Sequence, residues 1–253
     1  MNLAFPHTAQ LLRVYPVSKS YLILEFQRPK GFEFKAGQHV TLQLKDQLKD
    51  QLKDQVKDEI KDENGIFLRL YSIASPPSFK TRLEFCIQTQ DDARASALFQ
   101  HLETGTPIQM SAARGNFQIQ APCKSADNTL VFIAGGSGIS PLRSMILELI
   151  HELTPTQGQP PELHLLYGCR EADAIPFLEE LRGLPLLKSR FFAESSRSAY
   201  VQAGKVTAAF ELKSKLLASS NHFFLCGPPP MVNSIETMLL GQGIRRERIH
   251  FER

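Results

Sequence analysis

Three glycines lie close together in one short stretch of the chain, FIAGGSGISPLRSMI at residues 132–146. They stand between a sequence typical of a strand and a sequence typical of a helix. Gly135, Gly136 and Gly138 permit tight turns and let a ligand approach the backbone. The start of the following helix offers free N–H groups and a positive dipole end. This arrangement suits a pyrophosphate. Proline stands where the third glycine of a GxGxxG fingerprint would be, so glycines that merely close the turn remain an alternative.

Two further stretches carry residue types that could contact the same ligand. Cys226 ends an apolar run and is followed by glycine and three prolines, in LCGPPPM at residues 225–231. Because ligands of parallel sheets bind at the carboxyl ends of strands, Cys226 is expected to face whatever the glycines bind; a buried cysteine before a stiff loop is the alternative. RLYS at residues 69–72 offers an arginine for a phosphate, an aromatic ring for a planar group and a serine hydroxyl for a ring atom.

The elements that would position these residues change in character about half-way along the chain. In the first half, apolar runs rich in β-branched and aromatic residues alternate with Gly, Pro, Asn and Ser. This pattern is typical of a small antiparallel barrel or sandwich. The predicted strands occupy residues 13–29, 32–44, 67–75 and 82–90, and one predicted helix occupies residues 93–105.

The second half begins after a polar stretch at residues 118–129, which we interpret as a linker. Short apolar runs there alternate with helical patterns, and this order predicts a doubly wound parallel sheet. We therefore predict a β domain over residues 1–122 and an α/β domain over residues 123–253. The predicted strands occupy residues 130–135, 162–170, 189–195 and 223–226, and the predicted helices residues 140–153, 176–184 and 232–243.

Composition narrows the classes of protein that fit. The formal charge is only +3 and no lysine or arginine cluster forms a stripe, which argues against nucleic acid as a partner. No apolar run approaches the roughly 20 residues of a membrane span, and the N-terminus lacks a signal-peptide pattern. The four cysteines lie far apart and the seven histidines show no metal-binding spacing. We therefore expect reduced thiols, a cytoplasmic location and no metal site.

In their order along the chain, RLYSIAS, GGSGISP and CGPPPM resemble the motifs of the ferredoxin–NADP reductase superfamily. The stretches FEFKAGQHV and RIHFER extend the resemblance over nearly the whole chain. This family is the flavin and pyridine-nucleotide module shared by flavohaemoglobins, oxygenase reductases and cytochrome reductases. The resemblance implies an antiparallel Greek-key β-barrel that binds flavin, followed by a doubly wound parallel sheet that binds NAD(P).

The resemblance assigns one set of residues to the flavin. Arg69 would contact a flavin phosphate, Tyr71 would pack on the isoalloxazine and Ser72 would hydrogen-bond near its N5. The family's second phosphate motif, GxxS, is ARAS here, with Ala93 in place of glycine, and it would meet a pyrophosphate at a helix N-terminus. On this basis FAD is favoured over FMN. The residues expected at the flavin are Arg69, Leu70, Tyr71, Ser72, Cys86, Ile87, Gln88, Arg94, Ala95, Ser96 and Glu252.

A second set is assigned to the nicotinamide nucleotide. Cys226 would lie beside the nicotinamide C4, and Ser196, Arg197 and Tyr200 resemble the family's 2′-phosphate site. Arginine there favours NADPH, although Glu194 keeps NADH as an alternative, because an acidic residue suits the ribose hydroxyls of NAD. The residues expected at this nucleotide are Gly136, Ser137, Gly138, Ser196, Arg197, Tyr200, Cys226, Gly227, Pro228 and Met231.

The resemblance also implies a reaction. Hydride would pass from nicotinamide C4 to flavin N5, with Ser72 and Cys226 at the reacting atoms. Electrons would then reach a separate acceptor: a ferredoxin, a flavodoxin, an oxygenase component or free flavin. Alternatives are a free-flavin reductase and a non-catalytic regulatory subunit with this fold. Many relatives finish with an aromatic residue over the flavin; here that cover is either missing or supplied by Phe251.

One stretch fits none of these roles: a four-residue repeat, LKDQ, fills residues 45–64. In the family the strands on either side are antiparallel neighbours, so the repeat replaces a short hairpin loop. A straight helix would part the strand ends by about 27 Å at 1.5 Å per residue, which the hairpin forbids. We interpret it as a tolerated low-complexity insertion, because loop-closure entropy grows slowly with length. The alternative is a docking surface for an electron acceptor.

Overall fold

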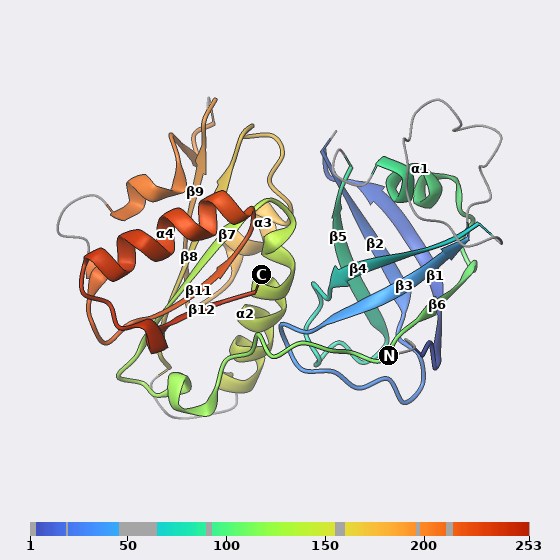
Figure 1. The fold of residues 1–253 in the computed structure, drawn as a ribbon, viewed down its shortest axis with the longest axis horizontal. Helices are drawn as coiled ribbons and strands as arrows, with labels where there is room; N and C mark the ends of the chain where they lie inside the picture. The colour runs from blue at the N-terminus through green and yellow to red at the C-terminus, as the bar shows by residue number, and fades with distance from the viewer. Residues whose placement is uncertain are drawn as a thin grey trace.

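The computed structural model describes residues 4–18, 20–45, 65–89, 93–154, 160–195, 198–210 and 215–252. These residues form two halves that lie side by side, each built around a six-stranded sheet (Figure 1). The predicted fold class, an antiparallel β domain followed by a parallel α/β domain, is confirmed. The first half is a half-barrel, with its two edge strands facing each other across an open side.

The first sheet consists of β1 (His7–Pro16), β2 (Tyr21–Gln27), β3 (His39–Lys45), β4 (Ile66–Ser72), β5 (Arg82–Gln88) and β6 (Pro107–Met110). Helix α1 (Ala93–His101) lies between β5 and β6 along the chain. Its order is β4-β3-β6-β1-β2-β5, with antiparallel pairings. Every second residue of β3 is buried, which places one face of the sheet on an apolar core. On the open side, the Ala74 N–H donates to the Glu84 carbonyl at 2.7 Å, next to the end of β4.

The second sheet consists of β7 (Thr129–Gly135), β8 (Glu162–Cys169), β9 (Leu187–Ala193), β10 (Val201–Ala203), β11 (His222–Cys226) and β12 (Ile249–Phe251). Its order is β10-β9-β8-β7-β11-β12, with parallel pairings. The chain runs outward from β7 to β10 and returns with β11 on the other side of β7. The strand order therefore reverses at β7, which is where ligands bind in open parallel sheets.

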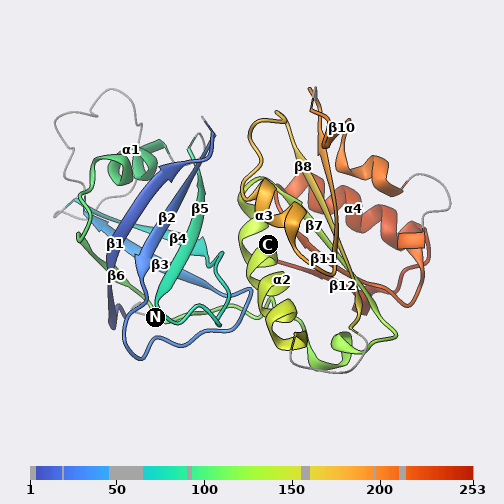
Figure 2. The same cartoon turned by 180° about the vertical axis from the view of Figure 1, so that it is seen from behind.

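Helices cover both faces of this second sheet. α2 (Ile139–Leu153) and α3 (Leu178–Gly183) pack on the face toward the half-barrel, and α4 (Pro229–Gly241) packs on the opposite face (Figures 1 and 2). Five short 3-10 helices complete the described part: η1 (Ala121–Lys124), η2 (Gly136–Gly138), η3 (Val206–Phe210), η4 (Lys215–Leu217) and η5 (Arg246–Arg248). No helix within the described ranges is both long and apolar enough to cross a membrane.

Several boundaries differ from the sequence prediction. The run at 13–29 is two strands, because β1 ends at Pro16 and the chain reverses before β2 begins at Tyr21, with the Val17 N–H donating to the Tyr21 carbonyl at 3.0 Å. The run at 32–44 is extended only from His39, since the residues before it make turns. β6, β10 and β12 were missed because strands of three or four residues carry too few positions to show an alternation.

The LKDQ repeat lies outside the described residues except for Lys45. The strands that flank it are antiparallel neighbours, as predicted, and Lys45 pairs with Ile66. The domain boundary predicted after residue 122 falls inside η1, in the segment that leads from the first sheet to the second. We retain that boundary as a proposal.

Helix α2 makes the hydrogen bonds that hold the two halves together. Its buried Arg143 donates to a Glu84 carboxylate oxygen of β5 at 2.7 Å and makes two hydrogen bonds, of 2.6 and 2.9 Å, to Glu180 of α3. The next residue, Ser144, donates to the Ser75 carbonyl at 2.7 Å. These contacts fix the half-barrel against the face of the second sheet.

Candidate functional site

The glycine loop and the cysteine loop meet at the reversal of strand order. η2 follows β7 directly, and the loop at Cys226 follows β11, the neighbour of β7. A Cβ placed on Gly138 would lie 2.3 Å from the Cys226 carbonyl oxygen and 2.6 Å from the Gly227 nitrogen. Only glycine permits this approach of two backbones. The two motifs singled out in the sequence thus form one surface.

The same glycine loop touches the half-barrel. Gly136 has a φ of +59°, and a Cβ there would lie 3.2 Å from Gln88 Oε1 and 3.3 Å from the Tyr21 hydroxyl. The Tyr167 hydroxyl donates to the Gly136 carbonyl at 3.2 Å. Burial raises the pKa of Tyr167 well above its usual value, so the hydroxyl keeps its proton and remains a donor. The end of β5 therefore adjoins the predicted nucleotide loop.

A carboxylate from the second half reaches the end of β4. Ser72 Oγ donates to Glu252 Oε2 at 3.4 Å, and His39 Nδ1 lies 3.0 Å from Glu252 Oε1. His39 and Ser72 are direct partners in the β3–β4 ladder, which explains why one carboxylate contacts both. Ser72 and Glu252, predicted separately, are brought together, whereas His39 was missed because its partner is 213 residues away in the chain.

Cys226 lies close enough to Glu252 for the carboxylate charge to act on its thiol. Burial, and to a smaller extent the negative charge of Glu252, raise the pKa of the Cys226 thiol to about 12. The thiol is therefore protonated at neutral pH and acts as a small, uncharged side chain rather than as a nucleophile.

On the other side of the half-barrel, two arginines converge on one ring. The guanidinium carbon of Arg69 lies 4.8 Å from the centre of the Phe67 ring, and that of Arg94 lies 4.7 Å from it. Tyr71 follows on the same side of β4, with its ring centre 6.4 Å from that of Phe85. The described structure thus brings two cations together beside Phe67, with the half-buried Tyr71 next on the same side of β4. Cations suit a phosphate, and an aromatic side chain suits a planar ring.

The remaining residues predicted to bind flavin lie at the start of α1 and on strands β4 and β5. Arg94, Ala95 and Ser96 form the first turn of α1, where backbone N–H groups lack helical partners. The Cys86 and Ile87 side chains are buried, and burial raises the pKa of Cys86 to about 12. β5 is an edge strand, so one of its two sides has no neighbouring strand in this sheet. Leu70 is 59% exposed.

The nucleotide predictions are partly within the described residues. Met231 and Pro228 pack on Gly135, where a Cβ would lie 2.7 Å from the Met231 sulfur. Ser137 lies in η2, half-buried. Tyr200 is 58% exposed and has the Arg182 guanidinium 3.4 Å from its ring centre. Ser196 and Arg197 lie outside the described residues.

One buried hydroxyl that the sequence did not single out stands next to the glycine loop. Ser140, the second residue of α2, is 2% exposed, and its Oγ makes no hydrogen bond within the described part of the chain. A buried hydroxyl without a partner is unfavourable by about 1–3 kcal/mol unless a ligand or water satisfies it. Its sequence context, GISP, gives no signal, because serine at a helix start is common.

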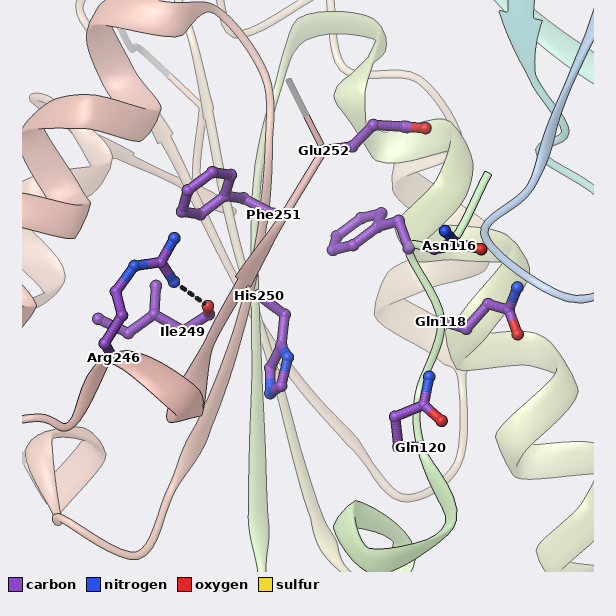
Figure 3. Close-up of a pocket in the computed structure, with 9 residues that line it drawn as sticks. Asn116, Gln118, Gln120, Arg246, Ile249, His250, Phe251 and Glu252 are labelled. Atoms are coloured by element: carbon purple, nitrogen blue, oxygen red, sulfur yellow. Dashed lines mark hydrogen bonds between the residues drawn. The ribbon is translucent and has the colours of Figure 1, made fainter. Parts of the chain in front are cut away.

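A cavity of about 370 Å³ opens beside Glu252, between β12 and the segment that joins the halves (Figure 3). Gln118 and Gln120 line one wall and Arg246 and His250 the other. Phe251 extends from β12 away from Glu252 and packs on the α4 side of the sheet, with Arg246 4.7 Å from its ring centre. Phe251 is thus not placed beside Ser72 as a flavin cover.

Comparison with known proteins decides which family this site belongs to. Residues 132–237 match the model described as the oxidoreductase NAD-binding domain. The chain is 29% identical over 263 residues to ferredoxin–NADP reductase B of Sorangium cellulosum (strain So ce56), covering 99% of this chain and 98% of that relative. Together these two comparisons support the ferredoxin–NADP reductase family for this chain, and the matched domain model makes it an oxidoreductase with an NAD-binding domain.

A solved structure and a longer sequence relative show how far the resemblance to ferredoxin–NADP reductases extends along the chain. A crystal structure of a ferredoxin NADP+ reductase from Neisseria gonorrhoeae with bound FAD and NADP superposes with a TM-score of 0.73 at 23% identity over 97% of both chains. The anthranilate 1,2-dioxygenase electron transfer component of Acinetobacter baylyi (strain ATCC 33305 / BD413 / ADP1) is 26% identical over 248 residues. That alignment covers 94% of this chain but 64% of the longer relative.

The residues present fit both groups that this family binds. Arg69 and Arg94 supply the charge that a flavin phosphate needs, and Tyr71 supplies an aromatic face. The close backbone approach at Gly138 and the unsatisfied Ser140 hydroxyl lie where a dinucleotide meets the start of α2.

Proposed function

We propose that this protein takes electrons from NADPH by way of a bound FAD and delivers them to a separate electron carrier. The observation that carries the proposal is the meeting of both halves at one point. The end of β4 meets Glu252 through Ser72 at 3.4 Å, and Gly136 of the glycine loop lies against Gln88 and Tyr21 of the half-barrel. The full-length match to a protein named ferredoxin–NADP reductase B supports the assignment.

The flavin would be held mainly by the half-barrel. Arg69 and Arg94 bind its phosphates, Tyr71 stacks on its ring and Ser72 hydrogen-bonds the ring near N5. Backbone groups of Cys86, Ile87 and Gln88, on the edge strand β5, border the ring. When bound, flavin supplies the ability to accept a hydride and to pass electrons on singly or in pairs.

The second half would orient the nicotinamide nucleotide. Gly136, Ser137 and Gly138 present backbone at the start of α2, where the helix dipole favours a pyrophosphate. The protonated Cys226 thiol gives the nicotinamide an uncharged neighbour, and the Arg143 contacts hold the two loops in register. Holding both reactants in fixed orientation is the main contribution that the chain makes to hydride transfer.

Preference for NADPH over NADH would rest on Ser196, Arg197 and Tyr200. Arginine matches the dianionic 2′-phosphate, which NADH lacks. Tyr200 is exposed and available for stacking, with Arg182 beneath its ring. Replacement of Arg197 by methionine would therefore weaken NADPH while leaving NADH largely unaffected.

FAD rather than FMN is supported by α1. Its first turn, at Arg94, Ala95 and Ser96, offers backbone N–H groups for a second phosphate, which FMN does not have.

The acceptor would be a small electron-transfer protein or an oxygenase component. Relatives named ferredoxin–NADP reductase B and anthranilate 1,2-dioxygenase electron transfer component support these two classes. A cytoplasmic location is supported by four free cysteines, none of which forms a disulfide within the described residues.

The test is an absorption spectrum of the purified protein followed by anaerobic titration with NADPH and then NADH. A flavin spectrum that bleaches at far lower NADPH than NADH is expected. The reverse preference would refute the role of Arg197. A protein that stays colourless after incubation with FAD or FMN would refute the reductase function and leave the non-catalytic regulatory subunit.

A further inference from the structure

Three side chains capable of binding a metal ion meet outside the reductase site. Cys123 comes from η1, His222 from the start of β11 and His250 from β12. Cys123 Sγ lies 3.5 Å from His222 Nδ1, and His222 Nδ1 lies 3.2 Å from His250 Nε2. All three ligand atoms lie within 4.8 Å of one another. Their separation along the chain explains why spacing alone gave no metal signal.

These distances are those of a tetrahedral zinc site. With Zn–S near 2.3 Å and Zn–N near 2.0–2.1 Å, neighbouring ligand atoms of a tetrahedron lie about 3.3–3.6 Å apart. The Cys123–His222 and His222–His250 distances fall close to this range, and the Cys123–His250 pair lies within 4.8 Å before any metal draws the ligands together. A thiolate with two imidazoles also suits zinc or copper(I) far better than magnesium or calcium.

The surroundings hold the ligands in place. Cys123 and His222 are buried, and the His250 ring stacks on Phe224 with a centre-to-centre distance of 4.6 Å.

The fourth position has access to solvent. His250 lines the cavity beside Glu252, and Figure 3 shows its ring pointing from β12 into the space in front of Gln120. A water molecule can enter by this cavity. Three protein ligands and an open fourth position complete the tetrahedron.

One residue competes with the metal. Arg248 Nη1 donates to His222 Nε2 at 2.7 Å, which leaves the single proton of the neutral ring on Nδ1, the atom that faces Cys123 and His250. A metal on Nδ1 requires the proton on Nε2, so Arg248 must release that nitrogen. It retains its second acceptor, the Ser220 carbonyl, at 2.7 Å.

We propose that Cys123, His222 and His250 bind one zinc ion, with water as fourth ligand, and that Arg248 weakens this site. Binding releases the Cys123 thiol proton and moves the His222 proton from Nδ1 to Nε2. The ion would tie the segment between the halves to β12, two residues before Glu252. This inference does not depend on the reductase function.

The test is zinc content and affinity of the flavin-loaded protein by equilibrium dialysis and metal analysis. Wild type is expected to retain one zinc per chain, and Cys123→Ser and His250→Gln to lose it. Cys169→Ser is the matched control and should retain it, because Cys169 lies outside the cluster and bonds the Glu171 carbonyl. X-ray absorption at the zinc edge should show one sulfur and two imidazoles.

Arg248→Met keeps all three ligands, so it reports on the site even where a ligand variant fails to fold. It should bind zinc at least about tenfold more tightly than wild type, since a hydrogen bond from a charged donor is lost on loading only in wild type. Absence of bound zinc in wild type, zinc without sulfur in its shell, or unchanged affinity in Arg248→Met would each overturn the proposal.

Discussion

Within the described residues, two contacts between a carboxylate and a basic side chain join the halves of this protein, and they differ in burial. The Arg143 and Glu84 side chains are 4% and 8% exposed, and their oxygen–nitrogen distance is 2.7 Å. The His39 and Glu252 side chains are 20% and 21% exposed, at 3.0 Å. The first contact involves three further acceptors, on Ala74 and Glu180, whereas Glu252 shares its carboxylate between His39 and Ser72.

This difference in burial distinguishes a contact that holds the halves together from a contact that belongs to the functional site. A buried ion pair with every hydrogen bond satisfied cannot open without leaving an unpaired charge in the interior. A partly exposed carboxylate such as that of Glu252 can exchange one partner for another, or for water, at a small cost in free energy. The Arg143 contact therefore positions the halves, and the Glu252 contact belongs to the site where they react.

The largest expected effect comes from Arg143→Met. It leaves Glu84 with only the more exposed Arg82, at 3.2 Å, as counter-charge and removes the donor to the Ala74 carbonyl. The free energy of unfolding should therefore fall by about 3–5 kcal/mol. Urea unfolding measures this. The matched control is Arg245→Met, whose pair with Glu247 is 63% and 62% exposed and should contribute at most about 1 kcal/mol. Equal losses in the two variants would contradict the assignment.

An intermediate effect is expected from Ser144→Ala, which removes a neutral hydrogen bond from the same interface. The Ser75 carbonyl would then be buried without this donor, and the free energy of unfolding should fall by about 1–3 kcal/mol. A loss as large as that of Arg143→Met would mean that packing rather than charge dominates this contact.

A smaller effect on stability is expected from Glu252→Gln. The amide retains the shape of the carboxylate and can still accept from Ser72, so the free energy of unfolding should change by at most about 1 kcal/mol. Thermal and urea unfolding of the same preparation check this. A loss above that of Ser144→Ala would make Glu252 a structural residue.

The smallest effect concerns stability at alkaline pH. Burial and Glu252 raise the pKa of Cys226 to about 12, whereas the unfolded thiol titrates at about 8.5. Between these pH values the folded state holds one proton more than the unfolded state, so stability falls as pH rises. Glu252→Gln lowers the folded pKa and should end this decline at lower pH. Cys86 and Cys169 contribute equally to the pH dependence of stability in wild type and Glu252→Gln, so their contributions cancel in the difference. If the free energy of unfolding depended on pH identically in the two proteins, the influence of Glu252 on Cys226 would be contradicted.

The sequence predicted the parts of this molecule that local patterns determine. Strongly apolar strands such as β7 and β11 and the glycine loop between β7 and α2 were recognisable because their signals lie within a few residues. Ser72, Glu252 and Cys226 were found through the resemblance, not from periodicity. In the described structure Ser72 contacts Glu252 and Cys226 lies near the same carboxylate, while their roles toward flavin and nicotinamide stay predictions.

What local patterns could not reveal are partners far apart in the chain. Arg143 looks like an ordinary helical arginine, and only packing of α2 on β5 buries it against Glu84. His39 is a strand residue whose partner belongs to the other half. Cys123, His222 and His250 come from three separate segments. Ser196 and Arg197 remain predictions, because they lie outside the described residues.

The most direct test of the account is single-turnover reduction of the bound flavin by NADPH, followed anaerobically by stopped flow in wild type and Glu252→Gln. The account predicts that the variant keeps its flavin and its stability but is reduced at least about tenfold more slowly, which corresponds to about 1.4 kcal/mol in the barrier. An unchanged rate would contradict it, since Glu252 would then stand outside the chemistry, and the two contacts between the halves would differ in burial alone.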